Sequence, residues 1–70
     1  MDTALFTVSP SLVGWLVSDG DRIEDIFSSR FWALKGADAL AHKRHVETGQ
    51  PTAVVLNYIG GETFVAGRYD

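Results

Sequence analysis

One helix-favouring stretch stands between two β-type regions, and this arrangement constrains the fold more than any other feature. Ser28 or Ser29 can cap the start of the helix, because a serine side-chain oxygen accepts a hydrogen bond from a backbone amide there. Gly49 favours the left-handed conformation that ends a helix, and Pro51 prevents its continuation. The sequence therefore predicts one helix that ends near Thr48. At about 100° per residue, its core stripe contains Ala33, Leu34, Ala37, Leu40 and Ala41.

Two groups of predicted strands flank this helix. Their alternating or β-branched residues place strands at 5–9, 12–18 and 22–27 before the helix and at 52–58 and 62–69 after it. Asp19-Gly20 and Gly60-Gly61 predict tight turns, because glycine tolerates the positive φ that such turns require. The expected structure is a single domain over residues 1–70 of the α+β class. Its order is β-β-β-α-β-β, with an antiparallel sheet and one helix packed on one face.

The predicted strands carry more apolar side chains than one helix can cover, since a helix shields only one face of a sheet. In the second predicted strand, Val13, Trp15 and Val17 lie on the face opposite Leu16. In the third, Ile23 and Phe27 lie opposite Ile26. In the fourth, Val55 and Ile59 lie opposite Val54, Leu56 and Tyr58. The sheet must therefore curl on itself or meet a second molecule, and this favours association over catalysis. The expected packing or contact residues are Trp15, Leu16, Val17, Tyr58 and Phe64.

Charge and composition oppose several classes of protein. Six Lys and Arg against nine Asp and Glu leave a net charge of −3, which argues against a surface built to grip phosphate. The chain has no Cys, so it holds neither a disulfide nor a thiolate metal site. No run approaches the roughly 18 apolar residues of a membrane span, and Asp2 stands where a signal peptide needs positive charge. We therefore expect a cytoplasmic protein without a membrane partner or a cofactor.

Two sets of polar residues on the predicted helix are the remaining candidates for chemistry. Lys43 and Arg44 belong to its mildly basic part and offer an alternative function in nucleic-acid binding. Asp38, His42 and His45 fall within about 60° of arc and form a weak candidate for a metal such as zinc. Their spacing differs from the i, i+4 pair of the metalloprotease helix. We therefore expect neither a resident metal nor an enzyme.

A series of landmarks runs along nearly the whole chain. They are Val8 with Pro10, Gly14-Trp15-Leu16-Val17, Phe31, Ala37 and Ala41, Gly49, Val54-Val55, Gly60-Gly61 and Arg68-Tyr69. A Gly-Trp-x-Val strand, a helix with Ala-x-x-x-Ala spacing and a C-terminal hairpin in this order resemble a small bacterial family of stand-alone domains of unknown function. That resemblance implies no activity. A second likeness, of topology only, is to the antitoxin domains of bacterial toxin–antitoxin pairs.

The leading hypothesis is a non-catalytic protein-binding or self-associating module, whose partner is another protein or a second copy of the chain. The alternative is a nucleic-acid-binding or toxin–antitoxin-type accessory protein that uses the basic helix face at Lys43 and Arg44. The excess of apolar strand positions favours the first hypothesis.

Overall fold

The elements of the fold follow the predicted order. A computed structural model describes residues 2–70. The elements are β1 (Ala4–Ser11), β2 (Gly14–Asp19), β3 (Arg22–Phe27), α1 (Arg30–Thr48), β4 (Thr52–Asn57) and β5 (Thr63–Tyr69). The α+β class and the order β-β-β-α-β-β are therefore confirmed. A helix able to span a membrane is not found among residues 2–70.

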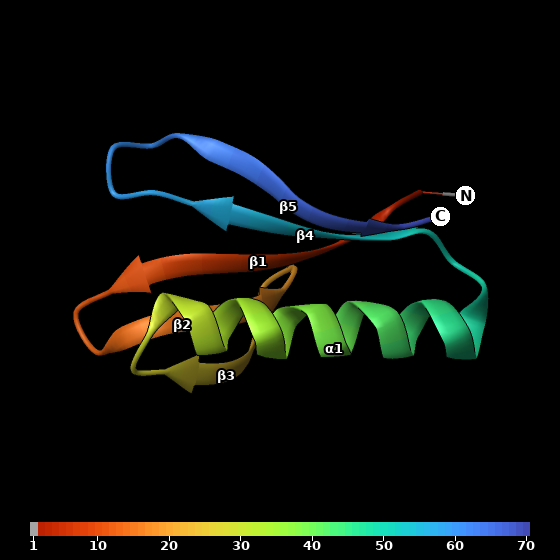
Figure 1. Cartoon of the computed structure of the whole chain (residues 1–70), viewed down its shortest axis with the longest axis horizontal. Helices are drawn as coiled ribbons and strands as arrows, with labels where there is room; N and C mark the ends of the chain where they lie inside the picture. Colours follow the sequence, from red (N-terminus) through yellow and green to blue (C-terminus); the bar gives the residue numbers. More distant parts are fainter. Residues whose placement is uncertain (1) are drawn as a thin grey trace.

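All five strands join one sheet in the order β3-β2-β1-β4-β5 (Figure 1). Neighbouring strands are antiparallel except β1 and β4, which run parallel with Phe6 opposite Val54. Two turns leave β3 running in the direction of β1, and α1 then returns the chain to the end at which β1 began. The sheet is thus mostly antiparallel with a parallel pair at its centre. It does not close on itself, because β3 and β5 are its two edges.

The helix α1 begins and ends where the sequence indicates. The Ser29 side-chain oxygen accepts a hydrogen bond from the Trp32 backbone amide at 3.2 Å, which satisfies one free amide of the first turn. Gly49 adopts a φ of 75° and donates its backbone amide to the His45 carbonyl oxygen at 2.8 Å. Most side chains are disfavoured at this φ, so a glycine ends the helix. Both cap predictions are confirmed.

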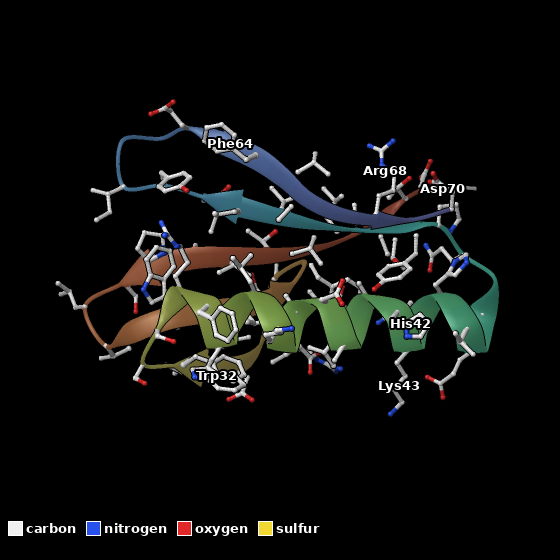
Figure 2. All side chains as sticks on the ribbon, in the orientation of Figure 1. Trp32, His42, Lys43, Phe64, Arg68 and Asp70 are labelled. Carbon is white, nitrogen blue, oxygen red and sulfur yellow. The ribbon has the colours of Figure 1, made fainter. Side chains whose placement is uncertain are left out.

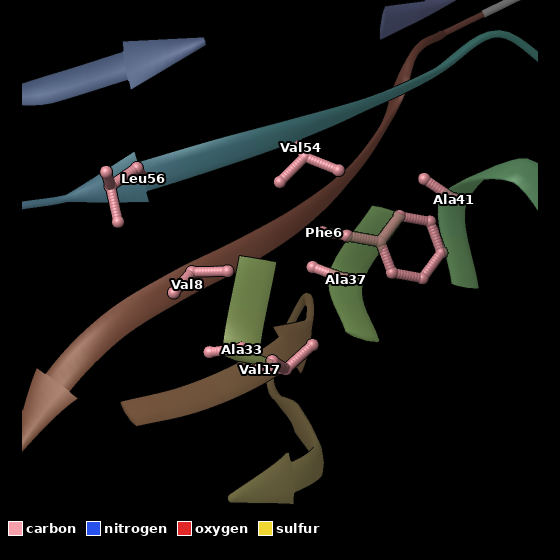
Figure 3. Close-up of a cluster of buried hydrophobic side chains, with 8 residues drawn as sticks. All are labelled: Phe6, Val8, Val17, Ala33, Ala37, Ala41, Val54 and Leu56. Carbon is pink, nitrogen blue, oxygen red and sulfur yellow. The ribbon is translucent and has the colours of Figure 1, made fainter. Parts of the chain in front are cut away.

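The core lies between α1 and one face of the sheet. Ala33, Ala37 and Ala41 form the buried stripe of the helix. Figure 3 shows them beside the buried sheet residues Phe6, Val8, Val17, Val54 and Leu56. Because alanine is small, the helix approaches the sheet closely, and the buried Thr52 hydroxyl donates to the Ala41 carbonyl oxygen at 2.8 Å. The predicted core stripe is confirmed, and its two leucines are partly buried.

A β-bulge in β3 changes the face that one predicted residue uses. The pairing with β2 places Ile23 and Ile26 on the same face, with Glu24 as the extra residue of the bulge. One inserted residue reverses the alternation of side chains along a strand. The expectation that Ile23 shares a face with Phe27 is therefore wrong.

The Phe27 side chain stays on the helix side and packs against α1. Its ring lies over Gly36, where a Cβ atom would come within 2.7 Å of Phe27 Cζ. Glycine inside a helix costs about 1 kcal/mol relative to alanine. The contact gives a physical reason for this glycine, because the missing side chain leaves room for the aromatic ring.

Candidate functional site

The face of the sheet that points away from α1 is called the open face below. Side chains alternate along a strand, so the neighbours of the buried core residues point to this side. Its aliphatic residues are Leu5 on β1, Leu16 on β2, Ile23 and Ile26 on β3, Ala53 and Val55 on β4 and Val65 on β5. Short polar side chains lie between them at Thr7, Ser9 and Ser18.

The larger aliphatic side chains of the open face remain in contact with solvent, whereas Ala53 is buried among them. Ile23 is 57% exposed, Ile26 49% and Val65 59%. Leu5 is 50% exposed, whereas Leu16 is partly buried by its neighbours. The elements of residues 2–70 are the five strands of one sheet and α1, which lies on the other side (Figure 1). Antiparallel sheets usually present polar residues on a solvated face, so this aliphatic face departs from the usual pattern.

The open face carries little charge. On β3, Asp25 pairs with the buried Val17, and Glu24 lines a hollow with Leu40 of α1, so both carboxylates lie toward the helix side. Within the strands of the described chain, Arg68 is the one charged residue that the register places on this face. A partner that recognises the open face must therefore do so through apolar contacts.

Both edge strands of the sheet contain a bulge. The extra residue is Glu24 in β3 and Ala66 in β5, where it stands between Val65 and Gly67. A bulge interrupts the row of backbone groups through which a further strand could pair. The edges are thereby protected against strand addition, whereas the open face has no comparable protection.

The structure separates the predicted contact residues. Leu16 lies on the open face, but Trp15 lies on the helix side and packs against the core. Val17 is fully buried, so it is a core residue and offers no surface to a partner. Tyr58 and Phe64 lie by the β4–β5 turn, away from the open face, with their rings edge to face at 5.3 Å; Figure 2 shows Phe64 there.

The expected contact residues left out most of the open face. The larger open-face residues not among them are Leu5, Ile23, Ile26, Val55 and Val65, although Ile23, Ile26 and Val55 are among the apolar positions of the predicted strands. Strand alternation was the available signal, because it groups residues that share a face. Alternation does not say which of the two faces the helix covers. The choice of face decides which group of residues stays exposed.

Lys43 and Arg44, the two predicted basic residues of α1, are compensated or paired by carboxylates within the chain. The Arg44 guanidinium donates to an Asp19 carboxylate oxygen at 2.7 Å. Lys43 is exposed and points away from the sheet in Figure 2, and the hollow beside it is also lined by Glu24 and Glu47. Carboxylates around both cations oppose the approach of a phosphate, so the geometry does not favour nucleic-acid binding here.

The Asp38, His42 and His45 side chains converge on Tyr69. The Tyr69 hydroxyl donates to Asp38 Oδ1 at 2.8 Å, and its ring stacks on those of His42 and His45 at centroid distances of 5.0 and 6.2 Å. The hydrogen bond to Asp38, with burial and the charge of that carboxylate, raises the pKa of Tyr69. In the part of the chain that the structure describes, no group of three His, Asp or Glu residues could hold a metal ion.

The open face thus combines exposed aliphatic side chains, little charge and, within residues 2–70, no covering element. In other proteins, exposed apolar patches of this kind often mark interaction sites. A match to a known protein would show whether relatives use the same face. Comparisons of the chain with protein families, with curated proteins and with solved structures found no match.

Proposed function

We propose that this chain is a non-catalytic module that self-associates, with two copies packing through the open faces of their sheets. The observation that carries this proposal is the exposure of Leu5, Ile23, Ile26 and Val65 on a face that no described element covers. Leaving these side chains in water is unfavourable, and burying them against a second apolar face is favourable.

A second copy is the partner that the charge distribution favours. The chain has a net charge of −3, so two copies repel each other over most of their surfaces. On the open face this repulsion is weakest, because Arg68 stands near the end of β5 and the other strand residues of the face are uncharged. A polyanion would meet one cation there, which is too few for binding through phosphates.

The size of the open face is sufficient for a reversible dimer. Its five strands, about 4.8 Å apart and about 20 Å long, present roughly 500 Å² of face in each copy. Two copies would bury about 1,000 Å² together, which is near the lower limit for a specific interface. We therefore expect a dimer that dissociates on dilution.

The centre of the open face is compatible with close packing of two sheets. Thr7, Ser9 and Ser18 lie between two aliphatic groups, one on β2 and β3 and the other on β1, β4 and β5. These polar side chains are short, so they do not hold two sheets apart at the usual spacing of about 10 Å. Their hydroxyls can exchange hydrogen bonds across the interface, which keeps buried polar groups satisfied.

The substitution Ile26→Lys tests this function. It places a charge on the open face of each copy, where dimerisation would bury it in an apolar interface without a partner. Val46→Lys is the matched control, because Val46 is 68% exposed on α1 and receives the same chemical change. Size-exclusion chromatography with light scattering, over a range of protein concentrations, measures the mass in solution.

The parent chain and the Val46→Lys variant should change from monomer to dimer as concentration rises. The Ile26→Lys variant should remain a monomer while keeping the circular dichroism spectrum of the parent. A parent chain that stays monomeric at every concentration, or a dimer that survives Ile26→Lys, overturns the proposal.

A further inference from the structure

A second group of exposed apolar residues lies at one end of the molecule. The β1–β2 turn, the β4–β5 turn and the start of α1 come together at the left of Figure 1. This region, called the hairpin end below, contains Pro10, Leu12, Val13, Arg30, Tyr58, Ile59 and Phe64. It is separate from the open face, and neither the core nor the proposed dimer uses it.

The tips of both hairpins protrude into solvent as aliphatic side chains. Leu12 is fully exposed, and Ile59 is 88% exposed. The shallow hollow between the two turns is lined by Pro10, Ser11, Leu12, Tyr58 and Ile59, so the tips lie beside each other. Turn positions normally hold Gly, Pro, Asn, Asp or Ser, and large aliphatic residues at two adjacent tips are not explained by turn geometry.

Aromatic and cationic side chains stand behind these tips. The Arg30 guanidinium lies 5.7 Å from the centre of the Tyr58 ring, and its Nη1 donates to the Tyr58 hydroxyl oxygen at 3.4 Å. On the next residues of α1, Lys35 Nζ lies 5.7 Å from the centre of the Phe31 ring. Amphipathic rings and long cationic side chains are the groups that settle at the interface between lipid headgroups and acyl chains.

The charge of the hairpin end differs from that of the whole chain. The two turns and the first two turns of α1 contain Arg30 and Lys35 against Glu62, whereas the chain as a whole carries −3. The acidic turn at Asp19 and Asp21 joins β2 to β3 and does not belong to this end. Asp38, three residues after Lys35 on α1, lines a hollow together with it. The hairpin end is therefore less acidic than the chain as a whole.

We infer that the hairpin end docks on the surface of a phospholipid bilayer. Leu12, Val13 and Ile59 enter the acyl-chain region, and Arg30, together with Lys35 further along α1, meets the headgroup phosphates. A protein partner would need a cavity shaped to two protruding tips, whereas a fluid bilayer adapts to them. This binding does not depend on the dimer, because its residues lie off the open face.

Co-sedimentation with vesicles is the first test. The parent chain should bind vesicles of phosphatidylcholine with phosphatidylserine, and more weakly those of phosphatidylcholine alone. Each aliphatic side chain withdrawn from the bilayer should lower binding about tenfold, so the double variant Leu12→Asp with Ile59→Asp should no longer sediment. Val46→Asp is the matched control, since its exposed valine lies in the last turn of α1, away from the hairpin end.

Tryptophan fluorescence gives a second readout. In Ile59→Trp, emission should shift to the blue when vesicles are added, because the new indole leaves water. In Val46→Trp the shift should be absent. The Ile26→Lys variant should bind vesicles as the parent does, so loss of the dimer and loss of membrane docking are distinguishable.

Three outcomes overturn the inference. They are no co-sedimentation of the parent chain, unchanged binding of a folded Leu12→Asp and Ile59→Asp double variant, and equal loss in the Val46→Asp control. If the tips bind only another protein, the parent chain does not co-sediment with vesicles.

Discussion

The two faces of the sheet are built from adjacent residues of the same strands and lie in opposite environments. Phe6 and its neighbour Leu5 on β1 are both large and apolar, yet Phe6 is 2% exposed and Leu5 50%. The alanine stripe of α1 covers the first face, and within residues 2–70 no element covers the second. The apolar content of a short chain sets how much surface could be buried, whereas the number of covering elements sets how much is buried.

The largest expected difference between the faces is in the free energy of unfolding. Phe6→Ala should lower it by about 3–5 kcal/mol, because a buried aromatic ring is replaced by a cavity. A chain of this length has roughly 4–10 kcal/mol in total, so this variant should lose about half of its stability. Leu5→Ala should lower it by less than about 1 kcal/mol when measured by urea denaturation at concentrations below dimer formation. Equal losses would mean that Leu5 is packed as tightly as Phe6 within a single copy.

A smaller effect tests how α1 fits its face. Gly36→Ala should destabilise the parent by about 1 kcal/mol, because the clash of the new Cβ with the Phe27 ring outweighs the gain in helix propensity. In a Phe27→Ala background the same substitution should stabilise by about 1 kcal/mol. Urea denaturation of the four chains measures this double-mutant cycle. If Gly36→Ala has the same sign in both backgrounds, the ring does not require the glycine.

The smallest expected effect concerns Tyr69, at the margin of the helix-covered face. Its folded-state pKa is raised above 10.0 by the hydrogen bond to Asp38, so folding favours the neutral phenol. The resulting stabilisation is complete below the unfolded pKa and is lost as pH rises through the folded pKa. The difference in free energy of unfolding between the parent and Tyr69→Phe should therefore shrink as pH rises above about 10. A difference that stays constant across that range would show that the hydrogen bond does not couple to folding.

Prediction from sequence succeeded where interactions are local. The serine cap, the alanine stripe and Gly49 act within one helix, and their roles could be assigned before any tertiary contact was known, with Ser28 and Ser29 as alternatives for the cap. Prediction failed at Ile23, because a bulge depends on pairing with β2. It also left Arg44 as a candidate for phosphate binding, because its partner Asp19 lies 25 positions earlier in the chain.

The sequence by itself determined the order of the elements, both ends of the helix and the stripe that enters the core, because caps, turns and alternation act between near neighbours. Only the tertiary structure decided that β1 and β4 pair in parallel and that α1 covers the face of Phe6 rather than that of Leu5. The strand pairing and the choice of face depend on contacts between segments far apart in the chain. Alternation marks two apolar faces equally, and the packing of one helix distinguishes them.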